Sequence, residues 1–299
     1  MKLLVYGAGA TGSLLSAHLH EAGHDDVSLL ARGERLATLR THGVQLAEAE
    51  SPVVRRVPVP VVEHPDGGYD LIAVCVCTHQ VDAVLESLAD VEGDVLFLLN
   101  WAAGPEPLGA VIGPERVLLG FPPAQAAGTM DGDVIRYRAA GLMTRRVPMP
   151  IGEPDGRSTP RVERIVQAFR TTGINAKAEP RMDAWLKTHA AFEVPLGQAV
   201  HATGGPGALA DDPNAVRDML HLMRQNLAAL PIPPVPRAFA ALQRLPEGLL
   251  VALLRRFLRS PTAAYSGLGS TSPSATAELK RLAEQLTPRD TAPAEAPHK

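Results

Sequence analysis

The chain has 299 residues, which suggests about two domains at the usual ~150 residues per domain. Hydrophobic residues make up 45% and charged residues 20%, which is ordinary for a folded globular protein and argues against a wholly disordered or fibrous chain. The net charge of −3 leaves no excess of basic side chains to neutralise phosphates, so nucleic acid is not an expected partner.

The first part of the chain alternates short aliphatic runs with stretches of helical periodicity, and glycines close several of them. The run at residues 71–77 is almost continuously apolar, which is typical of a central parallel strand covered on both faces. This β-α-β alternation predicts an α/β fold with a Rossmann-type, doubly wound parallel sheet. The predicted strands cover residues 2–6, 27–30, 71–77, 94–99 and 117–119, and the predicted helices cover residues 12–22, 34–42 and 80–88.

Two further extended stretches fit the parallel pattern less well. Residues 53–62 contain Pro58 and Pro60, so we expect them at an edge of the sheet or outside it. Residues 134–137 and 142–151 both read as extended, and this pair is a candidate to lengthen the sheet in the antiparallel sense.

From Met182 onward the pattern is helical, and Pro195 predicts a kink or break within a long first helix. The expected organisation is a Rossmann domain over residues 1–175, an all-helical C-terminal domain over 176–286 and a disordered tail over 287–299. The apolar helices between residues 214 and 258 could pack on their own domain or on a second copy, so a homodimer stays open.

The compartment is expected to be the reducing cytoplasm, because Cys75 and Cys77 share one strand face and are not placed to build a disulfide framework. The apolar run at residues 3–6 is too short for a signal peptide. The run at residues 249–254 falls far short of the ~20 residues that span a bilayer, so no membrane partner is expected.

A G-x-G-x-x-G motif lies between the first predicted strand and the first predicted helix, which is the context of a dinucleotide-binding loop. Its first glycine permits a tight turn, its second lets the backbone approach a pyrophosphate, and its third permits close helix–strand packing. The helix that follows offers free N–H groups to the phosphates. The motif consists of Gly7, Ala8, Gly9, Ala10, Thr11 and Gly12.

Arg32 follows the second predicted strand, where NAD sites place a carboxylate for the ribose hydroxyls. An arginine can pair with a 2′-phosphate instead, so the sequence favours NADP as the cofactor. Arg35 could assist, although its spacing favours a solvated helix face.

These features together resemble the ketopantoate reductase family over roughly residues 1–200. The glycine loop, the run from Leu30 to Gly33, Asn100 after a buried strand, the run from Asp131 to Ile135 and the segment from Trp185 to Lys187 carry the resemblance. It implies a Rossmann domain, a helical C-terminal domain and an active site in the cleft between them. In that family NADPH reduces the keto group of a 2-oxo acid, 2-dehydropantoate, to the alcohol.

The resemblance implies that Lys187 is the catalytic residue, and the chemistry agrees, because a ketone reduction needs a cation or proton donor at the carbonyl oxygen. By the same resemblance Asn100 contacts the nicotinamide ribose and the substrate, and Gln80 matches a cofactor-contacting segment.

Several positions depart from the family pattern. Ser272 and Glu278 are the nearest in position to a late serine and glutamate that hold substrate, but the surrounding motif is missing, and Glu278 could equally be a helix-dipole partner. The other departures are Trp101 where a glycine usually follows the asparagine, Cys77 where a cofactor-contacting lysine is usual, and Ala191 and Pro195 where substrate-binding asparagines are usual.

Residues His189 and Glu193 lie one helical turn apart and could form an acid/base couple or a structural pair. With Asn100, Trp101 and Ala191, Glu193 completes the predicted substrate-binding set. No histidine or cysteine spacing matches a closed zinc site, so no metal is expected.

The sequence therefore predicts an NADPH-dependent reductase of a 2-oxo acid or related ketone. Trp101, Ala191 and Phe192 would favour a less polar substrate than 2-dehydropantoate. An alternative is a catalytically silent NADP-binding protein that senses redox state or binds a partner, since the dinucleotide loop is intact while the substrate positions are altered.

Overall fold

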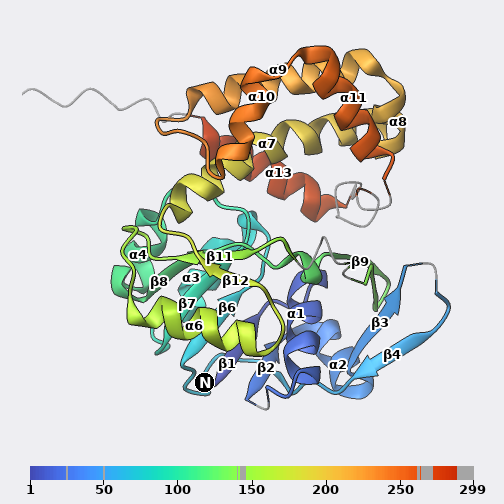
Figure 1. Cartoon of the computed structure of the whole chain (residues 1–299). Helices are drawn as coiled ribbons and strands as arrows, with labels where there is room; N and C mark the ends of the chain where they lie inside the picture. Colours follow the sequence, from blue (N-terminus) through green and yellow to red (C-terminus); the bar gives the residue numbers. More distant parts are fainter. Residues whose placement is uncertain are drawn as a thin grey trace, which may run out of the picture.

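The strand–helix units form one eight-stranded sheet at the base of the molecule (Figure 1). The structure, a computed structural model, describes residues 1–24, 26–49, 51–139, 141, 146–260, 263 and 272–287. The sheet has the order β12-β11-β8-β7-β6-β1-β2-β5, and its strands from β5 to β8 are parallel, as predicted. Its strands are β1 (Leu3–Tyr6), β2 (Val27–Leu30), β5 (Val61–Val62), β6 (Leu71–Val74), β7 (Asp94–Leu98), β8 (Val117–Gly120), β11 (Met149–Gly152) and β12 (Ala176–Ala178).

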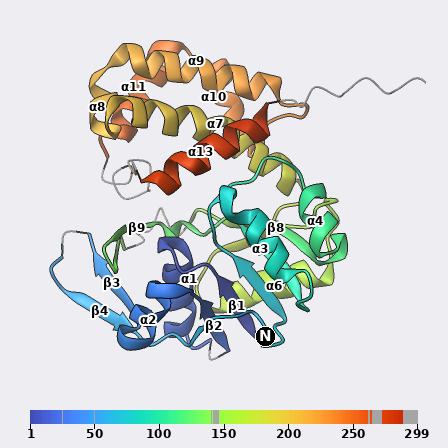
Figure 2. The same ribbon diagram turned by 180° about the vertical axis from the view of Figure 1, so that it is seen from behind.

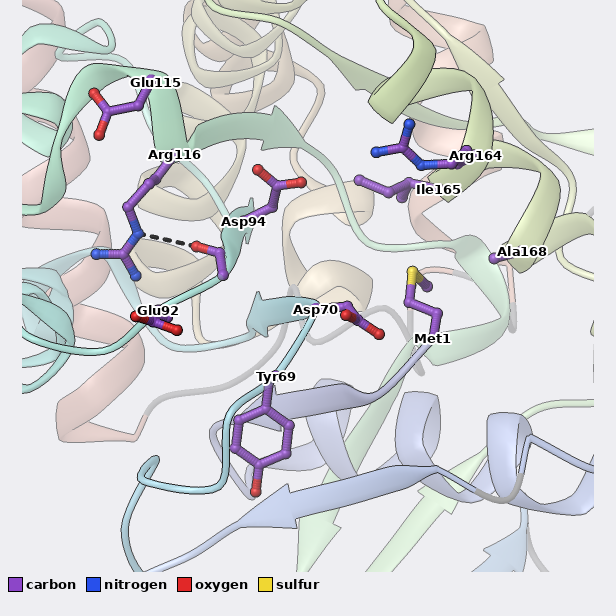
Figure 3. A pocket seen from close by; sticks show the side chains of 11 residues that line it. Met1, Tyr69, Asp70, Glu92, Asp94, Glu115, Arg116, Arg164, Ile165 and Ala168 are labelled. Carbon is purple, nitrogen blue, oxygen red and sulfur yellow. Dashed lines mark hydrogen bonds between the residues drawn. The ribbon is translucent and has the colours of Figure 1, made fainter.

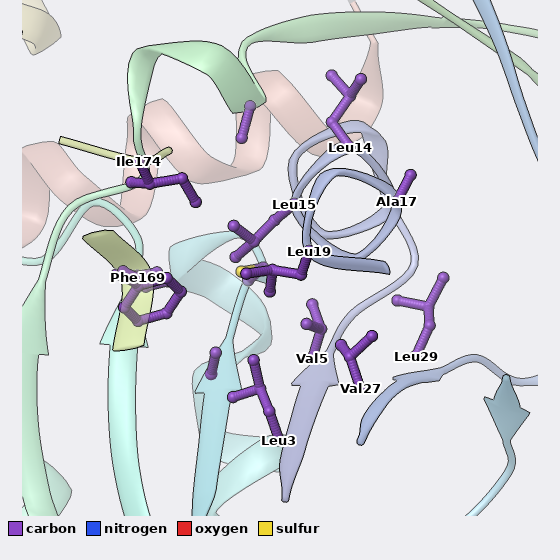
Figure 4. Packing of buried hydrophobic residues seen from close by; sticks show 14 of the residues in the cluster. Leu3, Val5, Leu14, Leu15, Ala17, Leu19, Val27, Leu29, Phe169 and Ile174 are labelled. Atoms are coloured by element: carbon purple, nitrogen blue, oxygen red, sulfur yellow. The ribbon is translucent and has the colours of Figure 1, made fainter. Parts of the chain in front are cut away.

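Helices cover both faces of this sheet, which explains why its central strands are aliphatic throughout. On one face, Leu15 and Leu19 of α1 point toward Leu3 and Val5 of β1, and Phe169 of α6 packs in the same cluster (Figure 4). On the other face α3 and α4 bury a second aliphatic cluster. These helices are α1 (Ala10–Glu21), α2 (Gly33–His42), α3 (Val81–Leu88), α4 (Glu106–Ile112) and α6 (Pro160–Thr171).

A separate four-stranded sheet, which the sequence did not predict, lies beside α1 and α2. It consists of β4 (Val54–Val57), β3 (Val44–Glu48), β10 (Val134–Tyr137) and β9 (Gly128–Asp131), in that order. The prediction that β10 and β11 together lengthen the main sheet is therefore wrong for β10, because only β11 pairs with β8. The parallel pairing of β3 with β10 joins segments about ninety residues apart, such as Gln45 and Val134. A pairing over this distance cannot be predicted from a local sequence pattern.

The helical domain lies above the main sheet and is built around the long helix α7 (Met182–Thr203). This helix continues through Pro195 without a break. Around it lie α8 (Pro206–Asp211), α9 (Pro213–Ala229), α10 (Ala241–Arg244), α11 (Glu247–Leu258) and α13 (Pro273–Leu286). Seen from behind, α13 runs along the side of this domain that faces the sheet (Figure 2).

The helical part begins with α7 at Met182, where the sequence pattern becomes helical. Ala176–Ala178 form β12, which pairs with β11, so these residues belong to the sheet rather than to the helical part. Among the described residues, no helix is long and apolar enough to cross a bilayer. The predicted tail beyond Thr287 lies outside the described residues.

Leu15 and Leu253 offer a matched test of this core, since both are helical leucines but Leu15 is 1% exposed and Leu253 is 50% exposed. Leu15→Ala is expected to cost about 2–5 kcal/mol of unfolding free energy, because it leaves a cavity between α1 and the sheet. Leu253→Ala is expected to cost less than about 0.5 kcal/mol. Urea unfolding followed by tryptophan fluorescence measures both, and equal losses would contradict this packing.

Candidate functional site

The glycine loop between β1 and α1 has the geometry that the motif predicts. Gly7 has a φ of +116°, and a Cβ on Gly12 would lie 1.9 Å from the Gly7 carbonyl oxygen. Both positions therefore exclude a side chain for reasons of backbone geometry alone. A Cβ on Gly9, in contrast, would meet no atom within 4 Å. The middle glycine thus faces open space, where a ligand can approach the backbone.

The first turn of α1 is available to an anion. Gly9 occupies the N-cap position, and no side chain caps the helix. The leading N–H groups of a helix have no partner within it, and the helix dipole places partial positive charge at the same end. An open glycine beside an uncapped helix end fits the pyrophosphate of a dinucleotide.

Two arginines approach this loop, one more than the sequence predicted. Arg32 is exposed at the end of β2, and its Nη2 donates to the hydroxyl of Tyr6 at 2.8 Å. Arg35, expected on a solvated helix face, instead donates from Nε to the carbonyl of Ala8 at 3.2 Å and from Nη1 to Oδ1 of Asp133 at 3.3 Å. The loop therefore carries a basic edge beside α2.

The carboxyl end of β7 holds Asn100, one strand away from the β6 turn. The Thr78 hydroxyl donates to the Asn100 carbonyl at 2.6 Å and reaches Oε1 of Glu278 at 3.4 Å. Asn100 Nδ2 donates to the same Glu278 oxygen at 3.5 Å. Asn100 Oδ1 is buried and has no partner among the described residues. A carboxylate from α13 thus closes over the sheet edge on which ligands of Rossmann folds bind.

The side of α7 that faces the sheet domain carries Glu193. At about 100° per residue, Met182, Leu186 and Gly197 project within about 40° of Glu193. Met182 and Leu186 are buried in the core of the sheet domain, and a Cβ on Gly197 would lie 2.6 Å from Leu279 of α13. Glu193 is therefore directed between α13 and the sheet.

Desolvation controls the protonation of both titratable groups on this side of α7. Burial, and then the charge of Glu278, raise the pKa of Glu193 to about 7. Burial lowers the pKa of His189 to about 4, so its ring is neutral at pH 7. The His189 ring packs against Phe121 and Trp185, with ring centroids 4.3 Å and 5.2 Å away. No hydrogen bond joins His189 to Glu193 in the described structure, so the predicted acid/base couple is not formed.

Lys187 lies on a different side of α7 from Glu193, about 120° away around the helix axis. Its Nζ donates to Oδ2 of Asp183 at 2.6 Å, in an (i, i+4) ion pair. The same nitrogen lies 3.9 Å from the position that a Cβ on Gly104 would occupy. The predicted catalytic cation thus lies near Gly104, in the same β7–α4 loop that carries Asn100.

Three further predicted residues have structural partners. Trp101 is 3% exposed and donates from Nε1 to the Gly104 carbonyl at 2.6 Å, so it fills the core instead of lining a pocket. Ala191 is 0% exposed. Gln80 is exposed, and its side-chain oxygen accepts from the Cys77 N–H at 3.1 Å, which holds the turn after β6.

The sequence did not decide whether Glu278 is a substrate-binding residue or a helix-dipole partner, and it did not indicate Thr78 as a site residue. Ser272, considered with Glu278, accepts from the Ala275 N–H at 3.2 Å and caps α13. Glu278 directly precedes Leu279, which packs against α7. A carboxylate next to the apolar face of a helix was the sequence signal that could have indicated Glu278 as a site residue. No group of metal-binding side chains was found among the residues that the structure describes.

A hollow lies at the opposite edge of the sheet (Figure 3). Met1, Asp70 and Asp94 line it from the amino ends of β1, β6 and β7. Arg116 also lines it, but its Nε is held by the Gly93 carbonyl at 2.9 Å. This hollow lacks the glycine loop and the free helix N-terminus, so the candidate site is the one at the carboxyl edge.

Known proteins share this sequence pattern over part of the chain. Residues 3–144 match the family model described as ketopantoate reductase PanE/ApbA. A 2-dehydropantoate 2-reductase of Mesorhizobium japonicum is 27% identical over 215 residues, covering 62% of this chain and 63% of the relative. Another from Archaeoglobus fulgidus is 28% identical over 177 residues, covering 59% and 55%. The chain thus spans less than two thirds of the length of these relatives.

Solved structures share the fold over nearly the whole chain. The 2-dehydropantoate 2-reductase from Porphyromonas gingivalis W83 has a TM-score of 0.63 at 20% identity, covering 90% of this chain and 97% of that one. A D-mandelate dehydrogenase in complex with NADH and anilino(oxo)acetate has a TM-score of 0.66 at 16% identity, covering 96% and 98%. The predicted Rossmann-type domain with a following helical part is thereby confirmed as the fold.

Gly9→Ala and Gly12→Ala separate the two roles of the glycine loop, which are cofactor binding and close backbone packing. Gly12→Ala is expected to destabilise the chain by about 1–3 kcal/mol or more, because the methyl group meets the Gly7 carbonyl. Gly9→Ala is expected to change stability by less than about 0.5 kcal/mol. It should nevertheless weaken NADPH binding at least about tenfold by filling the open space. Thermal melts and fluorescence titration measure both, and normal NADPH binding by Gly9→Ala would contradict this geometry.

Proposed function

We propose that this chain, whose residues 3–144 belong to the ketopantoate reductase family, is an NADPH-dependent reductase that converts a small carbonyl compound to the alcohol. The observation that carries the proposal is the position of Asn100 and Glu278 at the same sheet edge as the open glycine loop. The glycine loop follows β1 and Asn100 follows β7, on the two sides of β6. A dinucleotide lying across this edge would meet the glycine loop with its pyrophosphate and Asn100 with its nicotinamide end.

The glycine loop and the start of α1 would hold the pyrophosphate, for the geometric reasons given above. When bound, the nicotinamide supplies a hydride to a carbonyl carbon. Asn100, whose Oδ1 is buried without a partner in the described structure, is left with hydrogen-bonding capacity toward the ribose or the substrate.

NADP is proposed over NAD because the residues after β2 are basic. Arg32 stands where a ribose-binding carboxylate would be needed for NAD, and Arg35 lies on the other side of the loop. Two guanidinium groups at this edge can hold a 2′-phosphate through charge-assisted hydrogen bonds.

The proposed substrate class is supported by the family match and by the residues near the candidate site. A 2-oxo acid such as 2-dehydropantoate is the first candidate, and a less polar ketone is the second. The structural argument for the second is now the neutral aromatic group of Phe121, Trp185 and His189, since Trp101 and Ala191 are buried elsewhere.

A screen for NADPH oxidation tests the proposed function directly. The full chain is mixed with NADPH and a series of 2-oxo acids and uncharged ketones, and cofactor binding is measured separately by fluorescence. Turnover with at least one carbonyl compound is expected. Tight NADPH binding with no turnover on any of them would overturn the reductase and favour a silent NADP-binding protein.

Arg32→Gln tests the cofactor preference. We expect the Kd for NADPH to rise about 10- to 100-fold, because a charge-assisted hydrogen bond contributes about 1.5–3 kcal/mol. The Kd for NADH should change little. Arg40→Gln, which removes an exposed arginine from α2, the helix that follows Arg32, is the matched control. Equal weakening of NADPH and NADH by Arg32→Gln would argue against a 2′-phosphate contact.

A further inference from the structure

Arg35 of α2 connects three segments of the chain at the glycine loop. Its Nε donates to the Ala8 carbonyl at 3.2 Å, its Nη2 to the Ser13 hydroxyl of α1 at 3.5 Å, and its Nη1 to Oδ1 of Asp133 at 3.3 Å. The Arg35 side chain is 18% exposed, and that of Asp133 is 56% exposed. The guanidinium group therefore lies largely inside the junction of the glycine loop, α1 and the β9–β10 turn.

The β9–β10 turn belongs to the second sheet, which lies beside α1 and α2 (Figure 2). Gly132 and Asp133 connect the two strands, and Gly132 has a φ of +59°, which permits a tight turn. β9 packs against α1, since a Cβ on Gly128 would lie 2.7 Å from Cδ1 of Leu14. The backbone carbonyl of Asp133 also accepts from Arg35 Nη1, at 3.2 Å. The second sheet thus reaches Arg35 from a turn that is anchored on the helix following the glycine loop.

These contacts determine the direction of the Ala8 peptide group. The Ala8 carbonyl accepts from Arg35 Nε and also from Ser13 Oγ, the latter at 3.2 Å. The peptide group is planar and trans, so the N–H of Gly9 points in the opposite direction to this carbonyl. Arg35 therefore keeps the partial negative charge of the Ala8 oxygen on its own side of the loop. A carbonyl without these donors could turn toward the phosphates of a cofactor and repel them.

We propose that Asp133 is a positioning residue for cofactor binding, acting through Arg35 on the conformation of the glycine loop. This inference rests on the reductase function proposed above and deepens it, because it gives the second sheet a role in holding the cofactor. Arg32 discriminates between NADP and NAD in that function. The pair of Asp133 and Arg35 acts on the loop for the pyrophosphate, a group that both cofactors share.

The charge of Asp133 alone predicts the opposite effect on binding. A carboxylate near a bound phosphate repels it, so the loss of an acid without a positioning role would leave cofactor affinity unchanged or raise it. Asp131 provides the comparison, because it lies in the same hairpin, is exposed, and its Oδ2 accepts from Arg136 Nε at 2.7 Å. Its removal takes the same charge from the hairpin and leaves the contacts of Arg35 in place.

Asp133→Ala removes the carboxylate and keeps the backbone carbonyl that Arg35 also contacts. We expect the Kd values for NADH and NADPH to rise by the same factor, about 2- to 5-fold, which is the range of an exposed ion pair. NADH is the diagnostic cofactor, because it carries the pyrophosphate without the 2′-phosphate. Asp133→Asn, which keeps an acceptor oxygen, should restore part of the loss. Asp131→Ala is the matched control, and fluorescence titration should show unchanged or tighter binding of both cofactors.

Arg35→Met removes the donors and keeps much of the side-chain length. The Kd for NADH should rise at least about tenfold, and the Kd for NADPH by at least as much. In this background Asp133→Ala should cause no further loss, since its effect passes through the guanidinium group. Arg40→Met, which changes an exposed arginine in the last turn of α2, is the control. Losses that add in the double variant would mean that Asp133 acts independently of Arg35, which would overturn the proposal.

Thermal melts without cofactor show that each variant is folded. Asp133→Ala changes an exposed side chain, so its Tm should shift by less than about 4 °C. If Arg35→Met does not fold, the comparison of Asp133→Ala, Asp133→Asn and Asp131→Ala decides the question without it.

The binding outcomes separate this role from the proposed function. Unchanged or tighter NADH binding by Asp133→Ala would overturn the positioning role and leave the reductase proposal intact. A loss confined to NADPH would restrict Asp133 to the 2′-phosphate and would also overturn it. Absence of binding of either cofactor by the wild-type chain would overturn the proposed function itself, and this inference with it.

Discussion

The contact of α13 with the carboxyl edge of the sheet joins the helical part to the candidate site. The chain leaves the sheet after β12, builds the helical domain, and returns with α13 so that Glu278 meets Thr78 and Asn100 about two hundred residues away. Gly197 lies at this contact, where a Cβ would be 2.6 Å from the side chain of Leu279. Residues from both the sheet and the helical part therefore meet at this edge.

That contact also explains why the site is acidic while the cofactor end is basic. Arg32 and Arg35 lie beside the glycine loop, where phosphates are expected, whereas the far end of the same edge carries two carboxyl groups. Two charged carboxyl groups that are removed from water cost free energy unless one of them carries a proton.

Local patterns predicted the parts of the molecule that depend on neighbouring residues. The parallel order of the main strands and the roles of Gly7 and Gly12 follow from periodicity and from backbone geometry at glycine. The second sheet and the position of Arg35 depend on pairings across about ninety residues, which no window of sequence contains. The ion pair of Lys187 with Asp183 was likewise not predicted, because a motif can place a lysine on a helix without showing which partner its side chain takes.

The central claim is that the glycine loop, the Asn100 turn and the α7–α13 contact form one ligand site. Amide hydrogen exchange of the full chain, with and without saturating NADPH, tests this most directly. The account predicts slower exchange at the start of α1, at the residues after β7 and in the first half of α13. Protection confined to the opposite edge of the sheet, around Asp70 and Asp94, would contradict it, as would no protection at either edge.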